Sequence, residues 1–168
     1  SVATLTNNGI VSTSGAGAIT SATITNNLTF NMNGTHAVTA FTNAAAGTLN
    51  ISATPTVPTF TTLTVSAAGN TVNYTGAGAQ TVKVVAYSNL ILSGSGAKTM
   101  TGVSTINGNF TLAGTASASA AAALTIGGTV TLGNGTAFTA GSYTHNVAGG
   151  WTNNGTTFTN TGSTINFN

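Results

Sequence analysis

A short strand motif recurs along the chain at intervals of about twenty residues. Each copy places an apolar residue between polar ones and is followed by a turn rich in Gly, Asn or Ser. The first apolar residues of the copies, spaced 18 to 23 residues apart, are Leu5, Leu28, Leu49, Val72, Leu90, Phe110, Val130 and Trp151. A repeat of this length is typical of the coils of a solenoid.

A second recurring feature precedes the motif. In most copies an apolar or small residue lies four positions earlier: Ile24, Ala45, Ala86, Ile106, Ile126 and Val147. Between the two apolar positions lie residues such as Asn26-Asn27, Ala46-Gly47 and Gly127-Gly128. Because Gly and Asn tolerate positive φ, the pattern predicts a sharp corner at the same place in each coil.

These patterns predict an all-β fold, a single-domain parallel β-solenoid (β-helix) of about eight coils of 18–23 residues that spans residues 1–168. Abundant Thr and Val favour pleated, half-buried strands. Side chains would alternate between a narrow apolar interior and outward ladders of Thr and Asn. A β-sandwich is the alternative, because short alternating strands separated by turns also suit that fold.

The charge content narrows the function. The chain has no Asp or Glu, two Lys, no Arg, two His and no Cys, so 1% of its residues are charged; soluble domains typically carry about 25%. General acid–base catalysis, binding of hard cations and orientation of catalytic triads all normally rely on carboxylates. We therefore expect a protein that is not an enzyme and holds no cofactor.

The same composition bears on partners and location. A formal charge of +2 without a basic cluster does not suit a run of phosphates, so nucleic acid is not an expected partner. No segment offers the roughly 18 apolar residues of a membrane-spanning helix. The lack of Cys fits secretion without disulfides, and the absence of a leader-like start predicts a mature product.

Few side chains are candidates for a chemical site. His36 and His145 are 109 positions apart and have no Cys or carboxylate to complete a metal site, so the sequence predicts surface or corner positions for both. Lys83 and Lys98 are predicted to be solvated charges. No metal, catalytic or cofactor-binding residue is predicted.

The aromatic residues and Asn-x-Ser/Thr triplets give two further expectations. Trp151 and Tyr74 fall in the inward column and are predicted to lie in the core, whereas Tyr87 and Tyr143 could stack on a sugar if exposed. Triplets that formally permit N-glycosylation begin at Asn27, Asn33, Asn50, Asn73, Asn109, Asn134 and Asn154. The solenoid pattern produces such triplets by itself.

Several phrases resemble a known group of repeat proteins. They occupy residues 72–82, 87–102, 105–112 and 147–155, the last with the sequence Gly-Gly-Trp-Thr-Asn-Asn-Gly. They are similar to Thr/Asn/Gly-rich repeats of bacterial surface proteins exported by the type IX route, and more loosely to autotransporter and haemagglutinin-like β-helical adhesins. The resemblance covers about residues 62–168, implies an extracellular or cell-surface role and brings no catalytic residues. The complete lack of Asp and Glu departs from that group.

The two ends suggest how such a chain would function. The segments 1–6 and 163–168 are strand-like and carry no charge cluster or Pro, whereas natural solenoids usually cover their open edges. We expect a structural subunit of an extracellular filament, assembled head to tail from copies of itself by strand pairing. The expected assembly residues are Val2, Leu5, Ile165 and Phe167.

Other functions remain open at this stage. The chain could be a fragment of a large cell-surface adhesin that contacts surface or matrix glycans. Ice binding is a third hypothesis, because Thr-x-Thr ladders present regular hydroxyls and methyls; in the aligned column only Thr4/Thr6 and Thr129/Thr131 carry both threonines. A pectin-lyase-like enzyme comes last, because it would need carboxylates.

Overall fold

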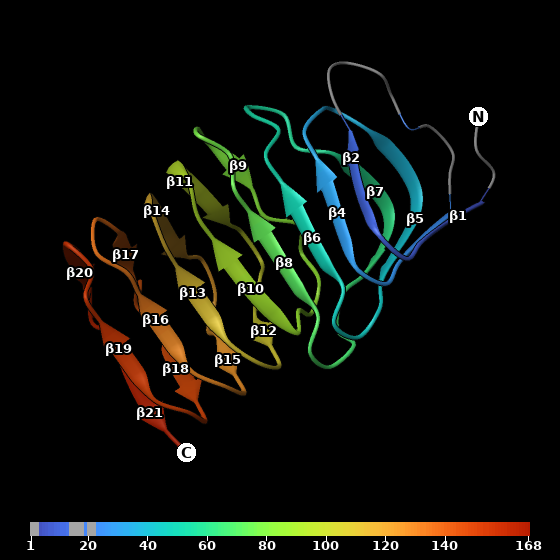
Figure 1. The fold of residues 1–168 in the computed structure, drawn as a ribbon. Coiled ribbons are helices and arrows are strands. Elements are labelled where there is room, and N and C mark those ends of the chain that lie inside the picture. Colours follow the sequence, from blue (N-terminus) through green and yellow to red (C-terminus); the bar gives the residue numbers. More distant parts are fainter. Residues whose placement is uncertain (1–3, 14–18, 20–22) are drawn as a thin grey trace.

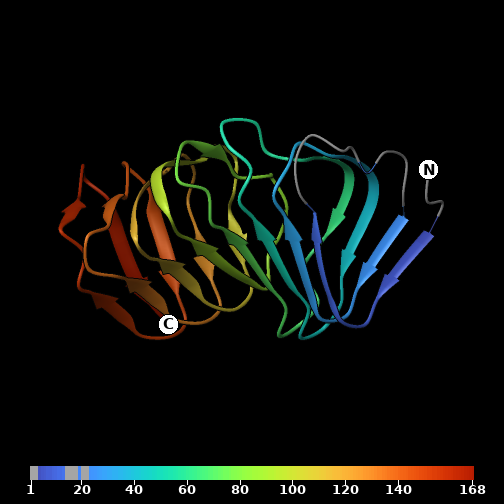
Figure 2. The ribbon, with the colours of Figure 1, turned by 45° about the horizontal axis from the view of Figure 1, so that its top comes forward.

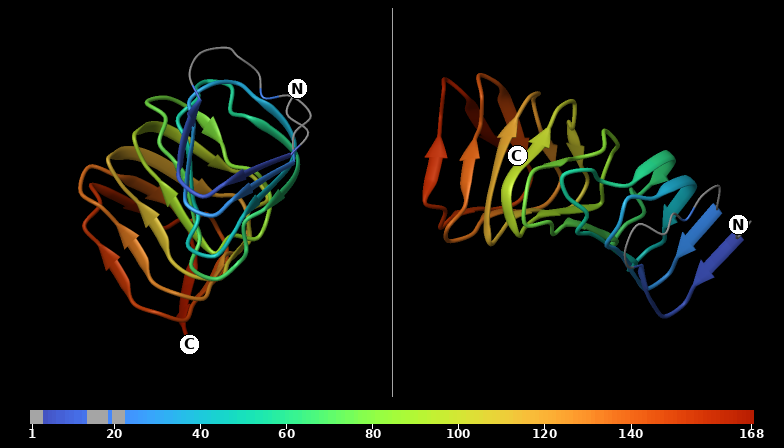
Figure 3. Two further views of the ribbon diagram at one scale, coloured as in Figure 1. Left: turned by 45° about the vertical axis from the view of Figure 1, so that its right-hand side comes forward. Right: turned by 90° about the horizontal axis from the view of Figure 1, so that it is seen from above.

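The computed structural model describes residues 4–13, 19 and 23–168, and within them all regular structure is β-strand. The 21 strands pair in parallel and wind into a rod of about eight turns (Figure 1). The predicted β-solenoid is confirmed, and the β-sandwich alternative is wrong. Viewed towards its end, the rod has three sides around a narrow interior (Figure 3, left).

The first side consists of two four-stranded sheets. Isolated parallel bridges from Val65 to Tyr87 and from Tyr87 to Ile106 connect them, so this side has nine levels along the rod. Its strands are β1 (Thr4–Asn7), β3 (Thr23–Asn26), β5 (Ala37–Asn43), β7 (Thr59–Thr64), β12 (Thr105–Ile106), β15 (Thr125–Ile126), β18 (Thr144–Val147) and β21 (Thr164–Phe167).

The second side is one continuous eight-stranded sheet and forms the spine of the rod (Figure 2). Its strands are β2 (Ile10–Thr13), β4 (Thr29–Met32), β6 (Thr48–Ile51), β8 (Thr71–Tyr74), β10 (Asn89–Leu92), β13 (Phe110–Leu112), β16 (Val130–Leu132) and β19 (Trp151–Asn153). Equivalent residues on neighbouring strands are 18 to 23 positions apart, as predicted.

Among the residues that the structure describes, the third side has strands only from the fourth turn onwards. Its five strands are β9 (Gln80–Thr81), β11 (Ser95–Met100), β14 (Thr115–Ala120), β17 (Ala137–Thr139) and β20 (Thr157–Thr159). In the second and third turns the loops 33–36 and 52–58 take this place.

The interior is filled by side chains that alternate inward along each strand. Strands of the second side show this pattern clearly: in β6, Leu49 and Ile51 are fully buried, while Thr48 and Asn50 are only partly covered. Edge-to-face contacts join Phe41 to Phe30 and Phe60 in the first half of the rod. In the second half Phe138 contacts Phe110, Trp151 and Phe158.

The predicted register is correct from Leu49 to Trp151 and wrong in the first two turns. Val11 and Phe30, rather than Leu5 and Leu28, align with Leu49. Leu5 belongs to the first side and pairs with Ile24, while Leu28 lies in the corner and is 48% exposed. In the segment Leu28-Thr29-Phe30 the larger Phe is buried, because its ring fills more of the interior.

Two residues predicted in the second inward column are also misplaced. Ala45 and Ala86 are both exposed. Phe41 and Tyr87 are the buried residues at these levels, and each makes far more interior contact than Ala could. Ile24, Ile106, Ile126 and Val147 are buried as predicted.

The corners between the first and second sides are tight, but not for the predicted reason. Positive φ occurs there at Ala46 (64°) and Gly69 (89°), whereas Gly127 and Gly128 have ordinary φ. A Cβ on Gly127 would collide with the backbone oxygen of Asn107 one turn below. Glycine is needed at this corner because successive turns approach closely, rather than for a left-handed conformation.

In the first half of the rod, buried asparagines fill the same corner; we call Asn7, Asn26, Asn43 and Asn70 the amide ladder. The Nδ2 of Asn7 donates to Oδ1 of Asn26 at 2.7 Å, and Nδ2 of Asn26 donates to Oδ1 of Asn43 at 2.7 Å. Asn70 donates to the backbone oxygen of Asn43 at 2.8 Å. All four are buried, and hydrogen bonds satisfy most of their amide groups, whereas Oδ1 of Asn70 is buried without a hydrogen-bond partner among the described residues.

Candidate functional site

The two ends of the rod present strand edges. β1 and β2 lie at the edges of their sheets at one end, and β19, β20 and β21 do so at the other (Figure 1). Parallel sheets normally have both edges covered or paired, because an open edge leaves backbone donors and acceptors available to another strand. The ends are therefore the first candidate site.

The N-terminal end also exposes part of the apolar interior. Leu5 in β1 and Val11 in β2 are only partly buried, although both pack against the core. Their partners one turn further in, Ile24 and Phe30, are completely buried. One more turn of solenoid would therefore bury the side-chain surface that Leu5 and Val11 still expose.

The C-terminal end repeats this arrangement. Trp151, Phe158 and Ile165 pack against the core but are only partly buried. Val130 and Phe138, which pair with Trp151 and Phe158 from the preceding turn, are 0% and 2% exposed. Both ends thus carry an incompletely covered apolar layer.

The structure locates three of the four predicted assembly residues at these edges. Leu5 and Ile165 point inward at opposite ends, and Phe167 is 61% exposed. Val2 lies outside the described residues. Following the strand register along the first side places Leu5 and Ile165 in one column, with Thr6 and Asn166 in the adjacent outward column.

The backbone of β21 is oriented for further pairing. The N–H groups of Thr164 and Asn168 donate to the backbone oxygens of Tyr143 and Val147, on the side of β18. In a parallel ladder alternate residues direct their N–H and C=O to opposite edges. Ile165 and Phe167 therefore direct theirs away from β18, towards the open end.

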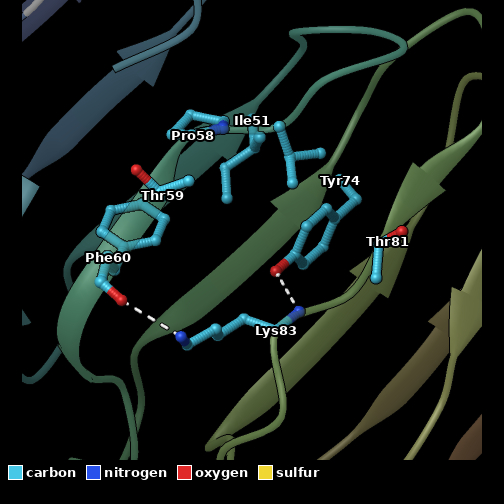
Figure 4. A pocket seen from close by; sticks show the side chains of 8 residues that line it. Ile51, Pro58, Thr59, Phe60, Tyr74, Thr81 and Lys83 are labelled. Carbon is cyan, nitrogen blue, oxygen red and sulfur yellow. Dashed lines mark hydrogen bonds between the residues drawn. The ribbon is translucent and has the colours of Figure 1, made fainter. Parts of the chain in front are cut away.

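A pocket beside the fourth turn is the second candidate site (Figure 4). It has a volume of about 190 Å³ and lies where the loop 52–58 meets β7, β8 and the segment after β9. Most of its wall is apolar. The lining residues are Ile51, Val57, Pro58, Thr59, Phe60, Tyr74, Thr81 and Lys83.

Lys83 forms one edge of this pocket. Its side chain is exposed, and its Nζ donates to the backbone oxygen of Phe60 at 3.1 Å (Figure 4). Its backbone N–H donates to the hydroxyl of Tyr74 at 2.9 Å. The prediction that Lys83 is a solvent-facing charge agrees with its exposure.

Behind the pocket two buried tyrosines form a short network. The hydroxyl oxygens of Tyr74 and Tyr87 are 3.3 Å apart, and the Tyr87 hydroxyl donates to the backbone oxygen of Lys83 at 2.6 Å. Burial raises the pKa of Tyr74 and raises that of Tyr87 well above its usual value, because a phenolate would lose its hydration. Tyr74 lies in the core as predicted, and burial of both rings excludes sugar stacking on either.

Lys98 contradicts the prediction of a solvated charge, since it is 1% exposed. Its Nζ donates to the backbone oxygens of Gly76 and Gly78 at 2.7 and 3.1 Å, and to Oε1 of Gln80 at 2.8 Å. Burial lowers the pKa of Lys98. Three oxygens use the three donors of the ammonium group, so this lysine holds the third side of neighbouring turns together.

Both histidines are buried, which corrects the prediction of surface positions. In His36, Nε2 is 2.8 Å from the Thr13 hydroxyl, and Nδ1 accepts from the backbone N–H of Ile19 at 3.2 Å. In His145, Nδ1 accepts from the backbone N–H of Leu124 at 3.1 Å, and Nε2 is 2.8 Å from the Ala140 oxygen. The His145 ring thus bridges two backbone groups, whereas the His36 ring bridges a backbone N–H and a threonine hydroxyl. Within the described ranges no group of three His, Cys, Asp or Glu residues could hold a metal ion.

The outward faces of the first two sides differ. On the second side polar side chains bond to one another across turns: Asn50 donates to Oδ1 of Asn31 at 2.8 Å, and Asn31 donates to the Ser12 hydroxyl at 2.9 Å. On the first side Thr6, Thr25, Thr42 and Thr64 form one column, and Thr4, Thr23 and Thr62 belong to the adjacent column. The pairs Thr4/Thr6 and Thr129/Thr131, expected in one column, therefore lie on different sides.

Comparisons with known proteins add no relative. The chain matches no protein-family model, and neither curated proteins nor solved structures yield a significant match. No helix in the described part of the chain is long and apolar enough to cross a membrane.

Proposed function

We propose that this chain is a structural, non-catalytic subunit of an extracellular filament in which copies stack head to tail through β21 and β1. The observation that carries the proposal is the incompletely buried apolar layer at both ends, together with open parallel edges of matching direction. Pairing would cover Leu5 and Ile165 and satisfy the outward backbone groups of β21. The resemblance to surface repeat proteins supports a location on the bacterial cell surface.

The side chains suit such a contact. Continuing the register of the first side places Ile165 against Leu5, Thr164 against Thr4 and Asn166 against Thr6 of the next copy. None of these side chains is charged, so stacking at about 4.8 Å brings no like charges together. A head-to-tail contact between different surfaces does not close on itself and generates a fibre.

The geometry also gives the expected repeat. The first side has nine levels, and at about 4.8 Å per level one subunit advances the filament by about 43 Å. In a stack of copies of this 168-residue chain, β21 begins a ninth turn while β19 belongs to the eighth, so the junction lacks one strand on the second side. Electron microscopy of the purified 168-residue chain should show rods with this axial repeat and a notch at each junction. Dispersed particles at high protein concentration would overturn the proposal.

Charge placement on exposed residues tests the contact without disturbing the interior. Thr6 and Asn166 both point outward, so the double variant Thr6→Lys/Asn166→Lys brings two ammonium groups together only at a junction. It should depolymerise the filament at low salt. The matched variant Thr6→Glu/Asn166→Lys should preserve assembly, and sedimentation measures both. Equal behaviour of the two variants would exclude this register.

A longer adhesin is the alternative structural role. There, further residues of the same chain would fill the second and third sides of the ninth turn and no subunit junction would exist. Mass spectrometry of native material separates the two roles, because a mature mass near 16.3 kDa supports a subunit and a much larger parent supports an adhesin.

A second candidate function, ice binding, is favoured by the outward threonines of the first side. Thr4 and Thr6 of β1 lie about 4.8 Å from their partners Thr23 and Thr25 of the neighbouring β3, and the two threonines of each strand are about 6.6 Å apart. The next pair, Thr62 and Thr64 of β7, lies beyond Ala40 and Thr42 of β5. Among the described residues, Thr6, Thr25 and Thr64 make no side-chain hydrogen bond within the protein, so their hydroxyls are available to ordered water. Thermal hysteresis should be measurable and should fall in Thr25→Tyr, while Thr131→Tyr on the second side should leave it unchanged. No hysteresis in the parent chain would exclude this function.

A further inference from the structure

The pocket in Figure 4 has the size and lining of a site for a small organic molecule. Its volume of about 190 Å³ exceeds that of an engineered apolar cavity of about 150 Å³ known to accept benzene. The rings of Phe60 and Tyr74, together with Ile51 and Pro58, line it (Figure 4). Apolar walls with few polar groups are typical of ligand sites.

The pocket lies at a discontinuity of the rod. Above β7 the first side continues only through single bridges, at Val65–Tyr87 and Tyr87–Ile106. The third side begins here with the two-residue strand β9. At this level the sheet of the first side is interrupted and that of the third side begins. The interruption leaves space that side chains of regularly paired strands fill in the other turns.

The charge beside the pocket specifies the ligand. Of the two lysines, Lys98 is buried and bonded to three oxygens, so Lys83 is the exposed one. Its Nζ makes one hydrogen bond, to Phe60, and an ammonium has three donors. No Asp or Glu exists anywhere in the chain to neutralise it. An anionic group at the mouth would gain the donors that remain.

We propose that this pocket binds a small aromatic carboxylate, with the ring against the half-buried Val57 and the carboxylate on the exposed Lys83 ammonium. The site is independent of the strand edges at the ends of the rod. A neutral ring would gain the apolar contacts alone, whereas an aliphatic anion would gain the charge with poorer ring packing. The expected preference is therefore for ligands that combine both features.

Benzoate is the probe, and benzamide is its neutral counterpart of nearly equal shape. Titration of the full chain with benzoate, followed by amide NMR shifts, should give a dissociation constant on the order of 1 mM, as expected for so few atoms. The largest shifts should lie at Ile51, Phe60, Thr81 and Lys83. Benzamide should bind about fivefold more weakly, because a partly exposed ion pair contributes modestly.

Three variants test the assignment. Lys83→Met should reduce benzoate affinity about fivefold and leave benzamide affinity unchanged. Lys83→Met/Ser119→Lys restores the net charge at an exposed position on the third side and should not restore binding. Val57→Trp should fill the pocket and abolish binding of both probes.

The outcomes separate clearly. Localised, saturable shifts that weaken in Lys83→Met support the site. Benzoate and benzamide binding equally well, shifts scattered over the rod, or no saturation well above millimolar ligand would each overturn it. Recovery of binding in the charge-relocated variant would show general attraction to a cationic surface and would also overturn it.

Discussion

The two halves of the rod enclose the same kind of apolar interior with strands of different lengths and with different residues at the corners. In turns one to four the first side has strands of four to seven residues, and in the described part of these turns the third side has no strand before β9. In turns six and seven, β12 and β15 on the first side have two residues each, while β14 and β17 on the third side have six and three. A constant repeat length therefore does not fix the cross-section, because residues can move from one side of the turn to another.

The corner between the first and second sides shows the contrast most directly. The first half fills it with the amide ladder, which joins turns through side chains. The second half closes it with glycines such as Gly127 and Gly149, whose missing side chains let backbones of successive turns touch. The stability of the corner should thus depend on asparagine hydrogen bonds in the first half and on the absence of glycine side chains in the second half.

The largest expected effect comes from removing the middle of the amide ladder. Asn26→Ala leaves Nδ2 of Asn7 and Oδ1 of Asn43 without this partner inside the protein, and should lower the free energy of unfolding by about 3 kcal/mol. Asn27→Ala is the control, because Asn27 is exposed and its bond to Asn8 lies in solvent. Denaturant titration measures both. Equal, small losses would show that the ladder does not stabilise this corner.

The corresponding variant in the second half of the rod adds a methyl group at the corner. Gly127→Ala forces a methyl group against the backbone oxygen of Asn107 and should cost about 2 kcal/mol. Gly150→Ala is the control, since nothing lies within 4 Å of its Cβ position and its φ is not positive. It should be neutral or slightly stabilising, by up to about 1 kcal/mol. If both variants unfold at the same denaturant concentration, close approach is not what requires glycine.

The boundary between the halves should respond to alkaline pH through the tyrosine pair. Tyr87→Phe removes the hydrogen bond to Lys83 and should cost about 1 kcal/mol at pH 7. Because burial raises the pKa of both phenols above 10.0, the unfolded chain loses these protons first, and stability falls as pH rises above 10.0. In Tyr87→Phe the free energy of unfolding should fall less steeply with pH, because one of the two buried phenols is absent. A parallel pH profile in the variant would contradict this account.

Lys98 should give the smallest effect, with the opposite sign. Its pKa in the folded protein lies below 10.5, so as pH rises towards 10.5 the folded chain releases the proton before the unfolded chain does. The free energy of unfolding of the unsubstituted protein, relative to that of Lys98→Met, should therefore rise as pH increases towards 10.5. Thermal unfolding of the two proteins at a series of pH values measures the difference. A constant difference would show that Lys98 titrates alike in both states.

Sequence reasoning was most successful where the repeat was regular. From β6 to β16 each second-side strand has two inward apolar residues, such as Leu49/Ile51, followed by a turn, whereas the second turn offers three alternating apolar residues in Leu28, Phe30 and Met32. In the first turns Leu28 and Phe30 lie two residues apart and suit the same face equally well in an alternating pattern. Only contacts with the rest of the interior decide between them.

Charge alone predicts a surface position for Lys98, because lysine side chains are rarely fully buried. The alternation in Lys98-Thr99-Met100 matches Ala118-Ser119-Ala120 one turn later, and this comparison would have placed Lys98 inward. Its acceptors are backbone oxygens of Gly76 and Gly78, which only the stacking of turns brings into place. The pocket was likewise beyond sequence reasoning, since it arises from an interruption of that stacking.

The hydrogen bonds between turns run along the rod, while the strands run across it. A pull on the two ends would therefore load these bonds one after another rather than together, and the rod would peel open one turn at a time. Each unfolded turn of about twenty residues would lengthen the extended chain by roughly 70 Å. In the proposed filament, each rod under tension would therefore lengthen in steps.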